Sequence, residues 1–397
     1  MKALILMRGA PGAGKSTWLK SYGLEPYTLC ADDIRLMFQG PIMDHESGKM
    51  CISQKNDAKV WTLLFDLLEQ RMQRGELCIV DACHSKAQEF TRYKKLASAY
   101  RYRVYCIDLT DVPLLVCLLR NRTREEVKHV PPEVIENIYS RFATQAPPSF
   151  VEVIKYDDVN KIREVVDEWK PKDFSACSKV VVFGDIHGCF MPLKKYFDEH
   201  PFDDNAMYIF TGDYTDRGIQ NKEVVKWLLE NYKKPNVVLL EGNHEKWLKE
   251  FANGDYDEEL KTGKKDKCKS SEFFFNTSKQ LEEFDKKDLR ELCRKLWQIC
   301  YFTFDGKKFI VSHAGVGFMP KSIMKVSAET FIKGSKYEDP VDEWFTKNNA
   351  DNDLYQIHGH RNIDHIAADA FEHSINLCDE IEFGKDLRVL EISKEEK

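Results

Sequence analysis

The sequence predicts two α/β domains in a single chain of 397 residues. In the first half, short apolar runs at 2–7, 78–82 and 102–109 alternate with amphipathic helical patterns, which is typical of a parallel sheet covered by helices. In the second half, four apolar runs each end in Asp, Asn or His, which favours a layered α/β sandwich with polar side chains gathered at one edge. Because the stretch 168–178 is turn-rich and polar, we expect domains at 1–170 and 178–397.

The composition is that of an ordinary globular protein, with 43% hydrophobic and 31% charged residues. Twelve cysteines occur without a CxxC pair, and only five apolar residues lie between Lys2 and Arg8, too few for a signal peptide or a membrane span. We therefore expect a reducing, cytoplasmic setting with no membrane partner, and cysteines that lie mostly in cores, a structural zinc site being the alternative. The net charge of −6 excludes a strongly basic coat, so any contact with a polynucleotide must be local.

The stretch GAPGAGKST, residues 9–17, follows the first apolar run and precedes a helical pattern. Its spacing matches the P-loop, in which glycines let backbone N–H groups turn toward phosphate oxygens. Lys15 is expected to bridge the β and γ phosphates of ATP, and the Ser16 hydroxyl to hold Mg²⁺. The predicted ATP-binding residues of the loop are Gly9, Gly12, Gly14, Lys15, Ser16 and Thr17.

A second motif, CADDIR at 30–35, indicates which kind of phosphate acceptor the ATP-binding loop could work with. A kinase that acts on a hydroxyl needs a carboxylate to accept the proton and a cation to hold the acceptor's own phosphate. Asp32 and Arg35 supply these two groups. The alternative is structural, because Asp32 or Asp33 could cap the helix that IRLMF predicts. Asp81, at the end of another predicted strand, is either a metal or acceptor contact or has no such role.

Three arginines, Arg120, Arg122 and Arg124, lie between a helical run and Pro131. Such a segment suits a lid whose guanidinium groups offset charge on a phosphoryl group in transfer, and a solvated helix end is the alternative.

Over roughly residues 1–150, the P-loop, ADDIR and the arginine lid occur in an order that resembles the 5′-OH polynucleotide kinases of phage and bacterial RNA-repair systems. The resemblance implies that Asp32 is the general base and that Arg35 grips the phosphate next to the 5′ end. It also implies that Arg124, together with Arg120, is the lid arginine.

The second half carries GDIHG (184–188), GDYTDRG (212–218), GNHE (242–245), SHAG (312–315) and HGH (358–360), in this order. Two neighbouring metal ions need oxygen ligands and imidazoles, with one carboxylate bridging them. The expected ligands, with Asp213 as the bridge, are Asp185, His187, Asp213, Asn243, His313 and His360. His358 is the alternative to His360.

This set of motifs, over roughly residues 178–393, resembles the binuclear calcineurin-like metallophosphoesterases. The resemblance implies that His244, oriented by Asp216, is a general acid or a water-positioning imidazole, and that Arg217 clamps the substrate phosphate. Two Mn²⁺ or similar ions are expected, because mixed nitrogen and oxygen ligands do not select one metal strongly. The charged segment 253–295 is expected to be a solvated cap or an insertion, and a substrate-sensing role is the alternative.

A kinase and a phosphatase that act on the same substrate atom would undo each other's reaction. If they act on opposite termini of a polynucleotide, both reactions are useful. The leading hypothesis is an RNA end-healing enzyme, similar to bacterial RNA-repair kinase–phosphatases. It would phosphorylate 5′-OH ends with ATP and remove a 2′,3′-cyclic or 3′-phosphate from the opposite ends. No KxDG motif of a nucleotidyl-transferring ligase is present, so a separate RNA ligase is expected, and the choice between RNA and DNA stays open.

An alternative keeps both sites and changes their substrates. GDxxDRG and GNHE also occur in Ser/Thr-type protein phosphatases and in dinucleoside tetraphosphate hydrolases, and either could be fused to a small-molecule kinase or a regulatory ATPase. A third hypothesis is an ATP-gated scaffold without turnover.

Overall fold

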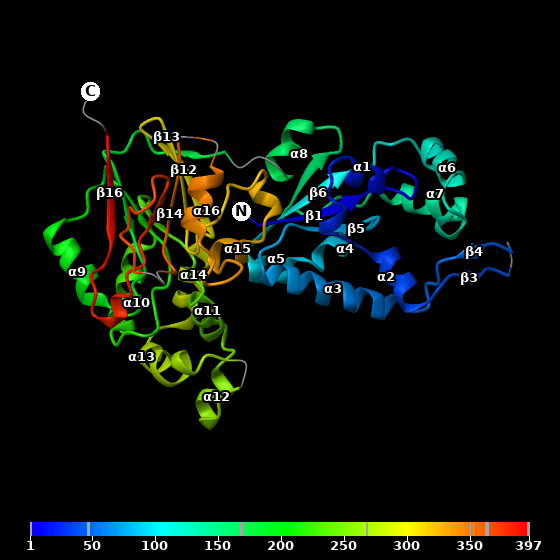
Figure 1. The fold of residues 1–397 in the computed structure, drawn as a ribbon. Coiled ribbons are helices and arrows are strands. Elements are labelled where there is room, and N and C mark those ends of the chain that lie inside the picture. The colour runs from blue at the N-terminus through cyan, green and yellow to red at the C-terminus, as the bar shows by residue number, and fades with distance from the viewer. Residues whose placement is uncertain are drawn as a thin grey trace. The chain divides into compact units, whose positions relative to one another are not determined.

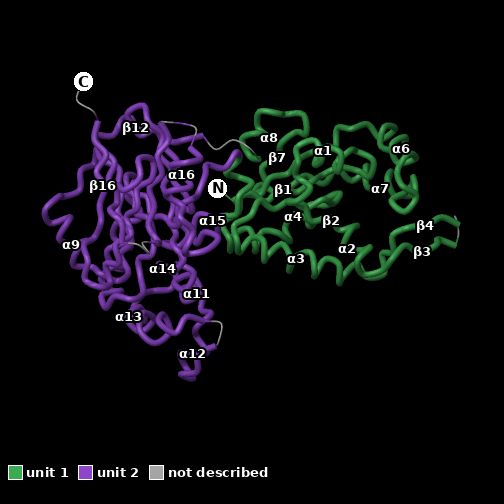
Figure 2. The backbone as a smooth tube through the Cα atoms, in the orientation of Figure 1, with its two compact units in different colours: residues 1–169, 322–327 green, residues 170–321, 328–397 purple. Residues whose placement is uncertain are grey.

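The chain forms two compact units, coloured separately in Figure 2. Unit 1 comprises residues 1–169 and 322–327, and unit 2 comprises residues 170–321 and 328–397. The computed structural model describes residues 2–45, 48–166, 170–266, 269–349, 351, 353–361 and 365–394. Part of the predicted boundary, residues 167–169, lies outside the described residues.

Unit 1 is built on a five-stranded parallel sheet in the order β2-β5-β1-β6-β7 (Figure 1). Along β1, Ala3, Ile5 and Met7 pack into one core, while Leu4 and Leu6 pack into another. This alternation means that both faces of the sheet are covered, as parallel sheets require. The strands are β1 (Lys2–Arg8), β2 (Thr28–Cys30), β5 (Cys78–Asp81), β6 (Tyr102–Asp108) and β7 (Val151–Lys155), and β3 (Ile42–Met43) and β4 (Met50–Cys51) form a separate antiparallel pair.

Helices cover the two faces of this sheet. On α3, Val60, Leu64, Leu68 and Met72 recur every four residues and are all fully buried, so one stripe of the helix faces the core. The helices are α1 (Lys15–Ser21), α2 (Ala31–Phe38), α3 (Asp57–Gln73), α4 (Ala87–Thr91), α5 (Lys94–Tyr100), α6 (Leu114–Arg122), α7 (Pro132–Arg141) and α8 (Val159–Val166).

Unit 2 contains two sheets. Residues of both, such as Val182 and Ile209 from one and Phe302 and Val311 from the other, share a single apolar core, so the sheets pack face to face. The first sheet, in the order β11-β10-β9-β16, consists of β9 (Lys179–Phe183), β10 (Met207–Phe210), β11 (Val237–Leu239) and β16 (Val389–Ser393). The second, in the order β15-β14-β13-β12-β8, consists of β8 (Lys172–Asp173), β12 (Ile299–Phe304), β13 (Lys307–Ser312), β14 (Leu354–His358) and β15 (Ser374–Asn376).

The outer face of the first sheet is covered by helices, since Phe183 and Phe210 pack with Leu193 and Leu228 of α9 and α10. The predicted fold class, a parallel α/β sheet followed by a layered α/β sandwich, is therefore confirmed. The helices of this unit outside the charged segment are α9 (Phe190–Glu199), α10 (Asn221–Asn231), α11 (Glu245–Asn253), α15 (Ala328–Ile332) and α16 (Val341–Asn348).

The charged segment 253–295 is a packed helical insertion. Phe273, Leu281 and Leu289 are buried there against Leu248 and Phe251 of α11, so the insertion has an apolar core despite its charged surface. It consists of α12 (Asp257–Thr262), a π-helical turn η3 (Phe273–Thr277), α13 (Ser278–Leu281) and α14 (Lys286–Lys295).

Cys78, Cys106 and Cys300 are free thiols that lie in cores. Within the described ranges, none of the helices combines the length and the apolar character that a membrane crossing would need.

We predict that Leu64→Ala lowers the free energy of unfolding of unit 1 by about 2–5 kcal/mol, because Leu64 is fully buried and the truncation leaves a cavity. The control Leu115→Ala removes a side chain that is 67% exposed, and it should change this quantity by less than about 0.5 kcal/mol. Urea unfolding followed by circular dichroism measures both. Equal losses in the two variants would contradict the described packing of α3.

Candidate functional site

The glycine-rich loop joins the end of β1 to α1 in unit 1. Gly12 has φ +84°, and a Cβ at this position would lie 2.3 Å from the Cys117 carbonyl oxygen, so only glycine allows α6 to approach the loop this closely. Gly14, with φ +102°, is the residue directly before α1, which begins at Lys15. The loop therefore has the strand–loop–helix context that the P-loop pattern requires.

Two polar side chains of the loop already have partners. Lys15 Nζ donates hydrogen bonds to the carbonyl oxygens of Gly9 and Ala10, at 2.9 and 3.2 Å. Ser16 Oγ donates to Asp81 Oδ2 at 3.1 Å, because β5 lies beside β1 and ends at Asp81. Burial raises the pKa of Asp81, and the positive charge of Lys15 opposes this shift without cancelling it. Asp81 thus lies at the loop, beside the Ser16 hydroxyl.

Asp32 and Asp33 lie in the first turn of α2, which begins at Ala31. The capping residue is Cys30, with no side-chain hydrogen bond to the helix, so the interpretation of Asp32 or Asp33 as a helix cap is wrong. Since Cys30 lies opposite Asp81 in the sheet, the helix start brings both carboxylates near the loop, and their charges help to raise the pKa of Asp81.

The Arg35 guanidinium lies between two carboxylates. Its Nη1 is 2.7 Å from Asp32 Oδ1, and its Nε donates to Asp57 Oδ1 at 2.9 Å. The side chain is only 12% exposed. Asp57, at the start of α3, is a partner that the sequence motifs did not single out. An acceptor phosphate would have to compete with Asp32 for the Nη1 group.

Of the three lid arginines, Arg120 contacts the loop, where its Nη1 donates to the Ala13 carbonyl at 3.2 Å. Arg120 and Arg122 end α6, and Arg122 is exposed. Arg124 lies half-buried just beyond the helix, and Thr17 is exposed on α1.

In unit 2, the predicted metal ligands follow strands of both sheets. Asp185, Asp213 and Asn243 come after β9, β10 and β11, and His313 and His360 come after β13 and β14. Because these strand ends meet at one edge of the sandwich, the side chains converge there.

The ligand atoms form two groups that share one carboxylate. His187, Asp213 and His244 make one group, and Asp213, His313 and His360 make the other, with the donor atoms of each group within 4.8 Å of one another. Asp213 Oδ2 lies 3.2 Å from His313 Nε2, 3.6 Å from His187 Nε2 and 4.0 Å from His244 Nε2. Asp213 thus occupies the place expected of a bridging ligand.

The remaining predicted ligands border the second group. Asn243 Oδ1 lies 3.2 Å from His313 Nε2, and Asp185 Oδ1 lies 3.7 Å from His313 Nδ1. By contrast, His358 Nε2 lies 2.8 Å from Asp342 Oδ1, and His358 belongs to neither ligand group. The structure thus brings His360, and not His358, into the cluster.

The electrostatics of the cluster favour a cation. Burial alone would raise the pKa of Asp213, but His313, His244 and His187 hold it well below its ordinary value. Burial alone would lower the pKa of His313, but Asp213 and Asp185 raise it to about 9. A buried site that attracts positive charge and offers imidazole and carboxylate donors fits divalent ions of the Mn²⁺ kind.

Several predicted site residues have left-handed backbone conformations, which cost about 1–3 kcal/mol each in non-glycine residues and persist only where the surrounding structure enforces them. The residues are His187 (φ +42°), Asp213 (+50°), Asp216 (+76°), Arg217 (+68°) and His360 (+70°).

His244 and Asp216 form the pair that the resemblance implied, with His244 Nδ1 2.6 Å from Asp216 Oδ2. Burial alone would lower the pKa of His244, but Asp213 and Asp216 together raise it above its ordinary value. His244 also belongs to the first ligand group, so its geometry suits either metal binding or proton transfer. Arg217, whose side chain is 47% exposed, is held at its Nη1 by Glu382 Oε1 at 2.6 Å.

The sequence motifs gave no role to three residues that hold the site together. Glu245, the last letter of GNHE, is fully buried and accepts hydrogen bonds from the backbone N–H groups of Asp213, Tyr214 and Gly242 at 2.7–2.9 Å. Burial and the charge of Asp213 raise the pKa of Glu245 to about 7. The other two, Glu382 and Thr277, lie outside every motif, so no sequence signal marked them.

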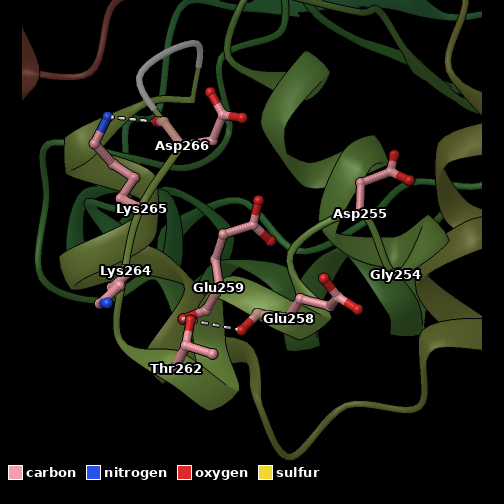
Figure 3. A pocket seen from close by; sticks show the side chains of 8 residues that line it. All are labelled: Gly254, Asp255, Glu258, Glu259, Thr262, Lys264, Lys265 and Asp266. Carbon is pink, nitrogen blue, oxygen red and sulfur yellow. Dashed lines mark hydrogen bonds between the residues drawn. The ribbon is translucent and has the colours of Figure 1, made fainter.

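The insertion holds a separate pocket, which Figure 3 shows in close-up. Carboxylates and lysines line it, and the lining shares no residue with the two ligand groups. The lining residues are Gly254, Asp255, Glu258, Glu259, Thr262, Lys264, Lys265 and Asp266.

Two family models match parts of the chain. Residues 178–389 match the calcineurin-like phosphoesterase family, and residues 4–145 match the AAA domain family. The chain thus carries a P-loop domain of the AAA type followed by a phosphoesterase domain that indicates a metal-dependent hydrolase.

Three solved structures are similar to stretches of the chain at low identity. A candidate diadenosine tetraphosphatase is 15% identical with a TM-score of 0.40, over 57% of this chain and 97% of that chain. A protein serine/threonine phosphatase from Saccharomyces cerevisiae is 13% identical with a TM-score of 0.36, over 57% of this chain and 84% of that chain. A candidate kinase from Chloroflexus aurantiacus is 20% identical with a TM-score of 0.31, over 41% of this chain and 95% of that chain. Similarity at this level identifies no substrate.

We predict that Glu245→Gln weakens Mn²⁺ binding by about 10–100-fold, the usual cost of losing a residue that orients metal ligands. The glutamine amide would place an NH₂ donor against one of the three backbone N–H donors, which would move Asp213. Calorimetric titration with Mn²⁺ measures the effect, and Glu250→Gln on the same helix is the matched control. Equal affinities in the two variants would contradict the role given to Glu245.

Proposed function

We propose that this chain, which belongs to the calcineurin-like phosphoesterase family, is a bifunctional enzyme that prepares broken RNA ends for ligation. Unit 1 phosphorylates a 5′-OH end with ATP, and unit 2 removes a 2′,3′-cyclic or 3′-phosphate from the opposite end. One observation carries the proposal: a loop of the P-loop type with a carboxylate beside it and two groups of possible metal ligands that share Asp213 occur in the same chain.

The pairing of activities explains why one chain has both sites. Many ribonucleases leave a 2′,3′-cyclic phosphate on one fragment and a 5′-OH on the other, whereas a ligase needs a 3′-OH and a 5′-phosphate. The two reactions act on different atoms, so neither undoes the other. A separate RNA ligase would complete the repair, and free thiols such as those of Cys78, Cys106 and Cys300 suit a reducing cytoplasm.

In the kinase reaction, Lys15 exchanges its loop carbonyl partners for the β and γ phosphates of ATP. Ser16 and Asp81 would hold Mg²⁺, which offsets negative charge on the transferred group when bound. Asp32 accepts the proton of the 5′-OH as the new O–P bond forms and the bond from the γ-phosphorus to the departing ADP breaks. Arg120, already on the loop, is joined by Arg124 as the lid closes on the phosphoryl group.

Arg35 would grip the phosphate next to the 5′ end. Because Asp57 holds its Nε, the guanidinium is oriented before the acceptor arrives, while its contact with Asp32 must loosen. This competition also frees Asp32 to accept a proton.

In the phosphatase reaction, the predicted ligands of unit 2 would hold two divalent ions, which supply Lewis-acid stabilisation and an activated water when bound. Arg217, oriented by Glu382, grips the substrate phosphate. His244 Nε2 donates a proton to the departing oxygen as its bond to phosphorus breaks, and Asp216 holds the imidazole at Nδ1.

We predict that the purified chain, given ATP, Mn²⁺ and RNA with a 5′-OH and a 2′,3′-cyclic phosphate, labels the 5′ end and releases phosphate. Lys15→Ala should abolish the labelling alone, because it removes the cation of the loop. Asp213→Ala should abolish the phosphate release alone, because it removes the ligand shared by both groups. Gel analysis of terminal groups measures both reactions.

Matched RNA and DNA oligonucleotides in the same assay determine which polymer is preferred. Much higher activity on a phosphopeptide or on diadenosine tetraphosphate would contradict RNA end-healing and favour a protein phosphatase or dinucleoside tetraphosphate hydrolase. ATP binding without transfer to any acceptor would instead support the scaffold hypothesis.

A further inference from the structure

The charged insertion, residues 253–295, contacts the candidate active site through the hydroxyl group of one threonine. Thr277, the last residue of the π-helical turn η3, is fully buried, and its Oγ1 donates a hydrogen bond to Asp216 Oδ1 at 2.5 Å. The other oxygen of the same carboxylate, Oδ2, lies 2.6 Å from His244 Nδ1. Thr277, Asp216 and His244 therefore form a continuous hydrogen-bonded series.

We propose that Thr277 is a positioning residue for His244: it fixes the Asp216 carboxylate, which in turn fixes the imidazole that protonates the leaving oxygen. This inference rests on the proposed phosphatase function. It gives the charged insertion a part in the chemistry, where the sequence had suggested a solvated cap or a sensor.

The neighbouring residue shows that this contact is specific. Ser278 is also fully buried, but its Oγ donates to the Phe274 carbonyl of its own helical turn, the usual bond of a helical serine or threonine. Thr277 instead donates across 61 residues of sequence to Asp216. Single π-helical turns of this kind occur often at functional sites, because the wider turn redirects a side chain.

A second contact ties the insertion to the same carboxylate residue. Asn221 Oδ1 accepts a hydrogen bond from the Asp216 N–H at 2.8 Å, and the Asn221 N–H donates to Gln280 Oε1 of α13 at 2.9 Å. The left-handed backbone of Asp216 is therefore held from two sides, by α10 and by the insertion.

A shared apolar core supports both the segment that carries Thr277 and the helix that follows His244. Phe273 and Leu281, on either side of Thr277, are buried against Leu248 and Phe251 of α11. His244 directly precedes α11. Because one core supports both elements, the separation between Thr277 and His244 is fixed.

The test compares two substrates whose leaving groups differ in basicity and little in size: phenyl phosphate and p-nitrophenyl phosphate. The more basic phenolate needs a proton donor, and the p-nitrophenolate hardly does. The full chain is loaded with Mn²⁺, and kcat, KM and bound manganese are measured for wild type, Thr277→Val, Thr277→Ala, Thr277→Ser and Ser278→Ala.

For Thr277→Val and Thr277→Ala we expect kcat to fall about ten-fold or more on phenyl phosphate and less than about two-fold on p-nitrophenyl phosphate. KM and bound manganese should not change. Thr277→Ser keeps the hydroxyl and should restore the wild-type kcat on both substrates, and Ser278→Ala should match wild type as the buried control.

An equal fall on both esters, a loss of manganese, or a Thr277→Ser variant as impaired as Thr277→Val would overturn the positioning role. Wild-type activity on both esters together with an unimpaired Thr277→Val would overturn it too, while the phosphatase function stands. A wild-type chain that hydrolyses neither ester would overturn the phosphatase function and this inference together.

Discussion

The Asp213 carboxylate is the constraint on which unit 2 depends. A buried negative charge is tolerated only when it is paired and hydrogen-bonded. Here the imidazoles of His187, His244 and His313 surround Asp213 Oδ2. The backbone N–H of His244 donates a hydrogen bond to the other carboxylate oxygen, Oδ1, at 2.9 Å. Each of these partners follows a different strand or loop, so the cluster exists only when the sandwich is complete. The fold of this unit is thus what brings the possible metal ligands together.

In unit 1 the fold also brings polar side chains together at strand ends, here around the predicted ATP-binding loop. Its sheet is fully parallel, so the ends of β1, β5 and β2 bring the glycine loop, Asp81 and the start of α2 to one edge. The polar and charged side chains at this edge contact one another or the loop: Lys15 contacts loop carbonyls, Ser16 contacts Asp81, and Arg35 contacts Asp32 and Asp57. A triphosphate bound to the loop would compete with the loop carbonyls for Lys15.

The sequence could predict the sheets and the clustering of the metal ligands for a physical reason. Alternating strands and helices imply parallel strands, and residues that follow parallel strands must meet. It could not predict the residues that orient the site's side chains. These residues are far from their partners in the sequence, and no recurring sequence motif marks them. Glu382 pairs with Arg217 across 165 residues, Thr277 with Asp216 across 61, and Asp57 with Arg35 across 22. The capping interpretation of Asp32 failed because the strand extends to Cys30 and α2 starts one residue before Asp32.

The central claim is that one carboxylate, Asp213, joins two metal sites. Anomalous X-ray diffraction from crystals of the full chain grown with Mn²⁺ tests this most directly. The account predicts two manganese peaks about 3.5–4 Å apart, the usual spacing of such pairs, with Asp213 as a ligand of both ions. A single peak, or two manganese ions that do not share Asp213, would contradict it.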